Sequence, residues 1–208
     1  MQNTFSAVKK SLIFIFLSYW FYTFSQTHDY LNWVVENLLV FIFVGFFIWQ
    51  RNTFKNSSLF SFSCIFLFVM MHISGSQYAY THHPIGIWMK DAFHLQRNGF
   101  DRLVHFSFGF LITIPLQEYI VQKLEVKQKL ASMISFLWIS TFAAVFELIE
   151  WIIGGVLFPE TGTDYVGTQG DVWDPQKDIA LAMIASLTIL FAYKPLFQRQ
   201  AVVQSEQE

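Results

Sequence analysis

Charged residues and cysteine are both scarce in this sequence. Asp, Glu, Lys and Arg make up 13% of its 208 residues, whereas an average soluble domain holds about 25%. The formal net charge is only -2, and the longest basic run is the pair Lys9 and Lys10, so we expect no nucleic-acid partner. The single cysteine, Cys64, excludes an intrachain disulfide. The sequence also lacks the common nucleotide and haem motifs, which argues against those cofactors.

Hydrophobic residues, by contrast, make up 54% of the chain and aromatic residues 19%. A helix of about 20 apolar residues crosses the ~30 Å hydrocarbon core of a bilayer, which excludes unpaired backbone groups. The sequence therefore predicts an all-α, polytopic transmembrane helix bundle of about six spans. We expect a single transmembrane domain over residues 1–198 and a short polar tail over 199–208. The predicted spans cover about residues 9–25, 33–50, 58–74, 102–122, 131–157 and 176–194.

The first apolar run has some features of a secretory signal, since Lys9 and Lys10 precede the stretch 11–24. The residues that follow at 25–28, Ser-Gln-Thr-His, are polar and bulky. Signal cleavage requires small residues at that place. We therefore expect an uncleaved first span.

The basic residues are distributed unevenly over the two sides of a six-span arrangement. Cytoplasmic loops carry an excess of Lys and Arg, so the richer side should be cytoplasmic. Both termini then lie in the cytoplasm, and the polar segments 75–101 and 158–175 lie on the opposite side. Nine of the thirteen basic residues fall on the richer side (Lys9, Lys10, Arg51, Lys55, Lys123, Lys127, Lys129, Lys194 and Arg199), and four on the other (Lys90, Arg97, Arg102 and Lys177).

Acidic and histidine residues recur at helical spacing near the non-cytoplasmic ends of the later spans. Asp101 and His105 are four residues apart, and Glu147 and Glu150 are three apart, so each pair shares one face of its helix. His72 ends the third span on the same side. An ionised Asp at the centre of a spanning helix costs at least about 2.5 kcal/mol. Such groups persist where they are paired, hydrated or bound to a cation.

These acids outnumber the bases near them, which favours a bound cation or shared protons over closed salt bridges. The oxygen-rich set indicates Mg, Mn or Ca, and Zn could bind through His105. The turn at 167–170 could direct backbone amides at a phosphate. The predicted site comprises catalytic residues (Asp101, His105), metal ligands (Glu147, Glu150, Asp171, Asp174, Asp178), substrate-binding residues (Arg102, Gln169, Gly170, Trp173) and a further histidine (His72).

Plainer structural roles stay open for several of these residues. Asp174 precedes Pro175, which is the pattern of an N-cap followed by proline in the first helical turn. Asp101 could cap the fourth span in a similar way. His105 could be a hydrogen-bonded core residue, and the stretch 167–170 could be a linker turn.

Three sequence elements resemble the YjdF-like family of bacterial inner-membrane proteins, over roughly residues 30–193. The elements are Asp101-Arg-Leu-Val-His-Phe106, Glu147-Leu-Ile-Glu-Trp151 and Thr168-Gln-Gly-Asp-Val-Trp-Asp-Pro-Gln-Lys-Asp178. The Asp-x-x-x-His-Phe helix is also similar, more distantly, to the VanZ-like membrane proteins. The resemblance implies a multi-pass protein of the bacterial inner (plasma) membrane, and it implies no particular reaction.

Three classes of function remain open on these grounds, all with membrane lipids as the expected partners. The leading hypothesis is metal-assisted chemistry on an envelope lipid or lipid-linked phosphate. The second is an ion- or proton-coupled transporter, for which Glu118 near the inner end of the fourth span is the obvious additional acid. The third is a structural or accessory subunit whose acids and histidines form a satisfied polar network.

Overall fold

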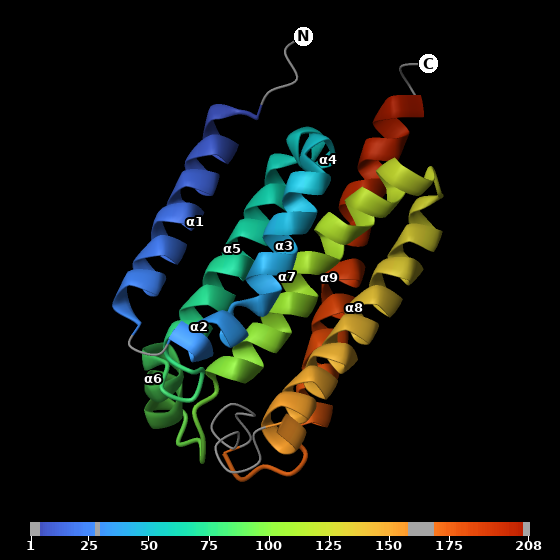
Figure 1. Cartoon of the computed structure of the whole chain (residues 1–208). Helices are drawn as coiled ribbons and strands as arrows, with labels where there is room; N and C mark the ends of the chain where they lie inside the picture. Colours follow the sequence, from blue (N-terminus) through green and yellow to red (C-terminus); the bar gives the residue numbers. More distant parts are fainter. Residues whose placement is uncertain (1–4, 28–29, 158–168, 206–208) are drawn as a thin grey trace.

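Helices account for all the regular structure in the part of the chain that the computed structural model describes, residues 5–27, 30–157 and 169–205. They form an elongated bundle (Figure 1), which confirms the predicted all-helical class. In chain order the helices are α1 (Ala7–Gln26), α2 (Tyr30–Glu36), α3 (Leu38–Trp49), α4 (Arg51–Asn56), α5 (Leu59–Gln77), α6 (Pro84–Ala92), α7 (Phe100–Leu124), α8 (Gln128–Trp151), a π-helical stretch η1 (Ile152–Leu157) and α9 (Asp174–Ser205).

Four helical segments among the described residues are long and apolar enough to cross a membrane. They are α5, α7, α8 with η1, and α9 as far as Tyr193. Helix α3 has only 12 residues, about 18 Å of helix, because the run predicted over 33–50 is broken at Asn37. The Asn37 side-chain amide there donates to the Trp33 carbonyl oxygen at 2.8 Å. The number of six spans therefore stays a prediction, as does the division into a domain and a tail.

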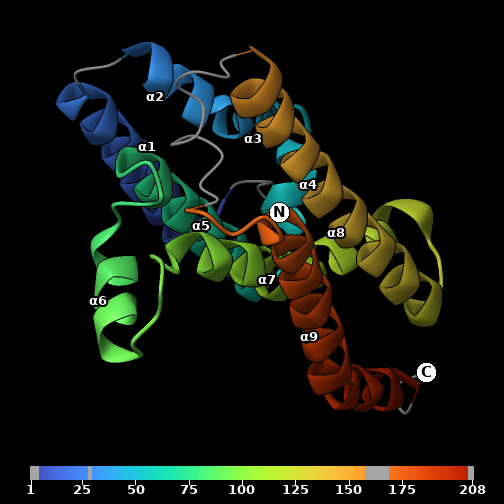
Figure 2. The ribbon, with the colours of Figure 1, turned by 90° about the horizontal axis from the view of Figure 1, so that it is seen from below.

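Helix α7 lies at the centre of the bundle and packs against α5, α8 and α9, while α1 packs against α5. The described parts of the two polar segments lie at one end, where α6 and the first turns of α7 and α9 are found (Figures 1 and 2). Helix α1 begins and α9 ends at the opposite end (Figure 1). This arrangement agrees with the predicted grouping of the polar segments, whereas the cytoplasmic placement of the termini stays a prediction.

Gly109 brings the backbones of α7 and α9 into contact. A Cβ atom at this position would lie 2.0 Å from the Ala182 carbonyl oxygen. One turn further along, the Thr113 hydroxyl donates to the Gly109 carbonyl oxygen at 2.6 Å and lies 2.8 Å from the Ser186 hydroxyl. Small residues of this kind let helices approach closely inside a membrane. The first turns of α7 and α9 are thereby held next to each other.

At the opposite end of the bundle, two charged side chains connect helices by hydrogen bonds to backbone groups of another segment. The buried Lys9 ammonium donates to the Phe54 carbonyl oxygen at 3.0 Å and to the Ser57 carbonyl oxygen at 2.6 Å. The Glu118 carboxylate accepts from the Ser58 backbone N–H at 2.6 Å and from its hydroxyl at 2.8 Å. Glu118 thus caps the start of α5, a structural contact that the sequence did not reveal.

His83 fixes the segment between α5 and α7. Its Nδ1 accepts the Ile85 backbone N–H at 3.2 Å and so caps α6, while Nε2 lies 2.8 Å from the Ser74 hydroxyl. The ring stacks on Phe100, the first residue of α7. An accepting Nδ1 requires a neutral imidazole, and burial lowers the pKa of His83 from 6.5 to about 4.

We expect Gly109→Ala to destabilise the protein by about 1–3 kcal/mol, the usual range for overpacking, because α7 and α9 must separate to admit the methyl group. Gly45→Ala on α3 is the matched control, since a Cβ atom there meets nothing within 4 Å. Thermal unfolding of both variants in one detergent measures the difference. A Gly109→Ala variant as stable as Gly45→Ala would contradict this packing.

The neutral state of His83 makes stability depend on pH. Because the folded pKa is about 4 and the unfolded value 6.5, the unfolded chain binds the proton first as the pH falls. His83 therefore contributes stability above pH 6.5, and this contribution is lost as the pH falls through about 4. We expect the decline in Tm over this window to be shallower in His83→Gln than in the wild type. Exposed His94→Gln serves as the control, and identical slopes in all three proteins would refute the role of His83.

Candidate functional site

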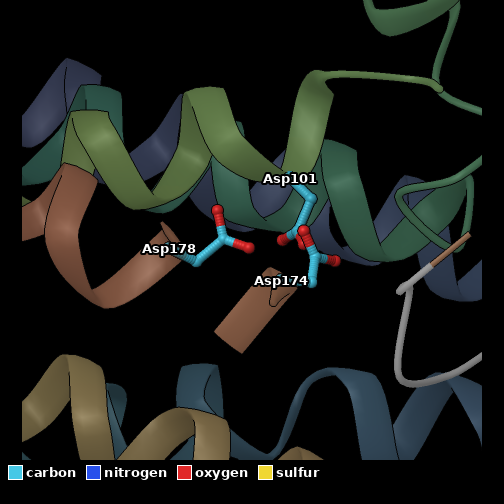
Figure 3. Close-up of side chains that lie close together, drawn as sticks. All are labelled: Asp101, Asp174 and Asp178. Carbon is cyan, nitrogen blue, oxygen red and sulfur yellow. The ribbon is translucent and has the colours of Figure 1, made fainter. Parts of the chain in front are cut away.

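Three buried aspartates converge at the polar end of the bundle. Asp101 of α7 and Asp174 and Asp178 of α9 each present a carboxylate oxygen, and these oxygens all lie within 4.8 Å of one another. Figure 3 shows the carboxylate groups gathered between the two helices. Such a set of oxygen atoms suits a hard divalent cation.

The convergence follows from local spacing together with the close approach of two helices. Asp174 and Asp178 are four residues apart and share a face of α9, as Asp101 and His105 do on α7. The contact between Gly109 and the Ala182 backbone then brings those two faces together. Three of the predicted site residues, Asp101, Asp174 and Asp178, are thus placed in one cluster.

Two arginines neutralise part of this negative charge. The buried Arg97 guanidinium pairs with Asp174 Oδ1 and lies 4.0 Å from Asp101 Oδ2. Arg102 Nη2 lies 3.0 Å from the same Asp174 oxygen. Helix α9 begins at Asp174, and the Lys177 backbone N–H donates to the Trp173 carbonyl oxygen at 3.0 Å. Asp174 therefore lies one position after the N-cap, and its side chain forms ion pairs with both arginines.

Asp101 does not cap α7. The N-cap of this helix is Gly99, and the Asn98 Oδ1 atom accepts the Phe100 backbone N–H at 3.0 Å. Asp101 lies inside the first turn, where its side chain is free to face the cluster. The capping interpretation of Asp101 was wrong because the helix begins at Phe100, two residues earlier than that role requires.

Asp178 has a carboxylate oxygen with no hydrogen-bond partner among the described residues. Its side chain is almost fully buried, at 1% exposure, and the unpartnered atom is Oδ1. A buried carboxylate oxygen without a donor costs about 1–3 kcal/mol or more. The cluster therefore contains a buried oxygen atom that no described protein group satisfies.

The His105 imidazole lies between two acids of different helices. Its Nε2 atom is 3.2 Å from Glu147 Oε1 on α8 and 3.6 Å from Asp101 Oδ1 on α7. All three side chains are buried. An imidazole can accept or donate a proton, so this position is compatible with the acid or base role predicted for His105, which stays a prediction.

One further acid, Glu150, and a second histidine, His72, lie near these groups. Glu150 of α8 is close enough for its charge to act on Glu147 and Asp178. His72 of α5 is buried, and its Nδ1 lies 2.6 Å from the Tyr80 hydroxyl. Glu150 was predicted as a metal ligand and His72 as a further histidine of the site. Their positions are compatible with these roles, which stay predictions.

Asp171 has a different environment from the other predicted metal ligands. Its Oδ2 atom lies 2.5 Å from Arg102 Nη2 and 2.6 Å from Lys177 Nζ. These hydrogen bonds, with that of Lys177 first, lower the pKa of Asp171 from 3.8 to about 2. Asp171 is therefore an ionised partner of two cations, and the structure does not group it with the aspartate cluster.

The predicted substrate-binding residues divide into two groups. Arg102, Gln169 and Gly170 line a cavity of about 690 Å³ beside the aspartate cluster. Gln169 also connects the segment before α9 with the segment before α7. Its side-chain amide accepts the Asn98 N–H at 2.9 Å and donates to the Asn98 carbonyl oxygen at 3.1 Å. Trp173 is exposed and does not appear among the described lining residues. Residues 167 and 168 of the predicted phosphate turn lie outside the described residues.

Sequence reasoning left Arg97 and Glu36 out of the site. Arg97 precedes the fourth span in a polar segment, so its sequence position gave no sign that it pairs with Asp174. Glu36 ends α2, and its charge acts on Asp101 and Glu150. The sequence could have indicated Glu36, because it is a lone acid within the predicted second span and intramembrane acids are rare outside functional sites.

Comparisons with known proteins agree with this architecture. The family described as "Predicted membrane protein (DUF2238)" matches residues 8–199. The chain is 31% identical over 186 residues to the inner membrane protein YjdF of Escherichia coli (strain K12), covering 88% of this chain and 84% of that relative. No solved structure matches, and the likeness to VanZ-like proteins stays a prediction. The recognised YjdF-like resemblance is thus confirmed, and the chain is an integral inner-membrane protein that belongs to the DUF2238 family.

Proposed function

We propose that this protein is a divalent-cation-dependent enzyme that acts on a phosphate-bearing lipid of the envelope at the non-cytoplasmic face of the membrane. The observation that carries the proposal is the aspartate cluster, in which the buried Asp178 Oδ1 atom has no described protein partner. Asp101, Asp174 and Asp178 would hold the cation. This set shares Asp174 and Asp178 with the ligands predicted from the sequence, and it replaces the other three ligands by Asp101.

The charge balance of the cluster supports a bound cation. Four acids of the site are buried, the three aspartates and Glu147, and the guanidinium groups of Arg97 and Arg102 both pair with a single one of them, Asp174. Like charges a few ångströms apart in a poorly solvated site cannot all remain ionised without a counter-charge. A divalent cation held by the three aspartates would supply this charge and would also give Asp178 Oδ1 a partner.

The chemistry of the ligands favours Mg, Mn or Ca. Carboxylate oxygens are the preferred ligands of these cations, whereas Zn sites usually contain nitrogen or sulfur. His105 remains the residue through which Zn could bind. A bound divalent cation would polarise a phosphate ester and stabilise the charge that develops on its oxygens.

His105 would move the proton in this proposal. Its Nε2 atom lies 3.2 Å from Glu147 Oε1 and 3.6 Å from Asp101 Oδ1, so a proton on Nε2 would be attracted by each of these carboxylates in its ionised form. His105 can accept a proton from an attacking hydroxyl group and return it to the oxygen that leaves. Glu147 and Asp101 then orient the ring, which is a positioning role for Glu147.

One observation favours transport as a second candidate function. Buried polar side chains continue from the site along α7 and α9, and Thr113, Gln117 and Ser186 are at most 1% exposed. The Gln117 Oε1 atom has no hydrogen-bond partner among the described residues. Glu118, the acid considered for a relay, instead caps α5. A structural network is the third candidate, supported by the ion pairs of Arg97 and Arg102.

Elemental analysis of the purified protein, after equilibration with Mg²⁺, Mn²⁺ and Ca²⁺ and removal of the excess, tests the cation site. We expect the wild type to retain a stoichiometric divalent cation and Asp178→Asn to lose at least about tenfold in affinity. Asp91→Asn is the matched control, because Asp91 is exposed on α6. Equal cation content in wild type and Asp178→Asn would contradict the proposal.

A second measurement separates cation binding from chemistry. We expect His105→Ala to keep the cation and to leave the envelope lipids in the state found without the protein, because only the proton transfer is lost. Mass spectrometry of lipid extracts from cells with wild type, His105→Ala or no protein makes the comparison. Identical lipids in all three strains, together with ion flux by the wild type into proteoliposomes, would favour the transporter.

A further inference from the structure

The cavity beside the aspartate cluster is lined by two chemically different kinds of side chain. The cationic groups are those of Arg97, Arg102 and Lys177. The apolar lining includes Leu103 and Phe106 of α7 and Leu181 of α9. Phe106 and Leu181 follow Arg102 and Lys177 by one helical turn, so apolar groups continue along both helices from the cations. A cavity with cations next to aliphatic and aromatic groups is complementary to an anionic amphiphile.

We propose that this cavity binds the phosphate monoester headgroup of a lipid, and that the Asp171 carboxylate occupies the position of that headgroup when no lipid is bound. This inference rests on the proposed function, because it names the substrate class of the same site. It adds a specific position for the phosphate and an intramolecular competitor for it.

The contacts of Asp171 indicate where the phosphate binds. A single oxygen, Oδ2, lies 2.5 Å from Arg102 and 2.6 Å from Lys177, so the two cations are already arranged around one anionic oxygen. A phosphate monoester carries more charge than a carboxylate and offers three acceptor oxygens. Asp171 lines the cavity and precedes α9, so its side chain is not part of a helix. The headgroup can therefore displace it without any rearrangement of the helices.

Arg102 connects this position with the aspartate cluster. The same Nη2 atom that pairs with Asp171 also lies 3.0 Å from Asp174 Oδ1. A phosphate on Arg102 is then adjacent to the residues that would hold the cation. A cation on Asp174 would in turn weaken the hold of Asp174 on Arg102 and leave the guanidinium for the phosphate.

The apolar lining residues provide a path for the lipid chain. Leu103, Phe106 and Phe110 follow one another at helical spacing on α7, and the Phe106 and Phe110 rings stack. Phe110 is 36% exposed on the outside of the bundle. This face leads from the cavity toward the middle of α7. Inorganic phosphate would gain none of these contacts, which is why we assign the site to a lipid.

Isothermal titration calorimetry of the detergent-purified protein tests the inference in the presence of a chelator. The probes are dihexanoyl phosphatidate, dihexanoyl phosphatidylcholine and inorganic phosphate. We expect phosphatidate to bind at least about tenfold more tightly than either of the others, because only phosphatidate combines a phosphate monoester with acyl chains. Equal affinity for inorganic phosphate, or no binding of phosphatidate, would overturn the assignment.

Substitutions at the ion pair give effects of opposite sign. Arg102→Gln should weaken phosphatidate binding about tenfold through the loss of a charged hydrogen bond, whereas Asp171→Asn should strengthen it several-fold by removing the competitor. Lys177→Gln, at a half-exposed side chain, replaces Arg102→Gln if that variant fails to fold. Lys90→Gln on α6 is the control and should change nothing. If Asp171→Asn binds no more tightly than the wild type, the competitor role is wrong.

The chelator makes the two proposals separable. Phosphatidate binding by a protein that retains no cation would leave this inference standing and contradict the cation-dependent function. A protein that retains the cation but does not bind phosphatidate would contradict this inference alone.

Discussion

Mutual repulsion among buried carboxylates is the constraint on which this structure depends. Asp101, Asp174 and Asp178 face one another within 4.8 Å at the end of a membrane-embedded bundle, where the loss of hydration makes each charge costly. Arg97 and Arg102 compensate for part of the charge through Asp174. The remaining deficit, together with the unpartnered Asp178 oxygen, is the physical reason to expect a cation at this place.

The rest of the fold holds these acids together against their repulsion. Contact between Gly109 and the Ala182 backbone keeps α7 and α9 close. At the other end, Lys9 and Glu118 bind backbone groups of the α4 and α5 region. His83 fixes the segment that precedes α7 by capping α6 and stacking on the first residue of α7. A site on rigid helices, with its cavity at their ends, is the arrangement that preorganised ligand groups require.

The sequence was a good guide to features that depend on local spacing. Apolar runs located the long helices, and the intervals between Asp101 and His105 and between Asp174 and Asp178 placed each pair on one helix face. Interruption of the second run at Asn37 was missed, because it depends on tertiary contacts such as the hydrogen bond from the Trp20 indole to the Asn37 side chain.

The sequence could not show which charged side chains of different segments pair with one another. The prediction grouped Asp171 with Asp174 and Asp178, but only the fold shows that Asp171 pairs with Arg102 and Lys177. Arg97 was likewise left out, although it contacts Asp174 across 77 residues of sequence. Spacing along one helix defines a face, whereas the groups that meet that face depend on how the helices pack.

The position of a bound cation is the most direct test of the account. Crystals of the protein grown with Mn²⁺ would locate the ion by its anomalous scattering. The account predicts one peak at about 2.0–2.6 Å from carboxylate oxygens of Asp101, Asp174 and Asp178. A map without a peak between these residues, or with Mn²⁺ only at Asp171 or at the protein surface, would contradict it.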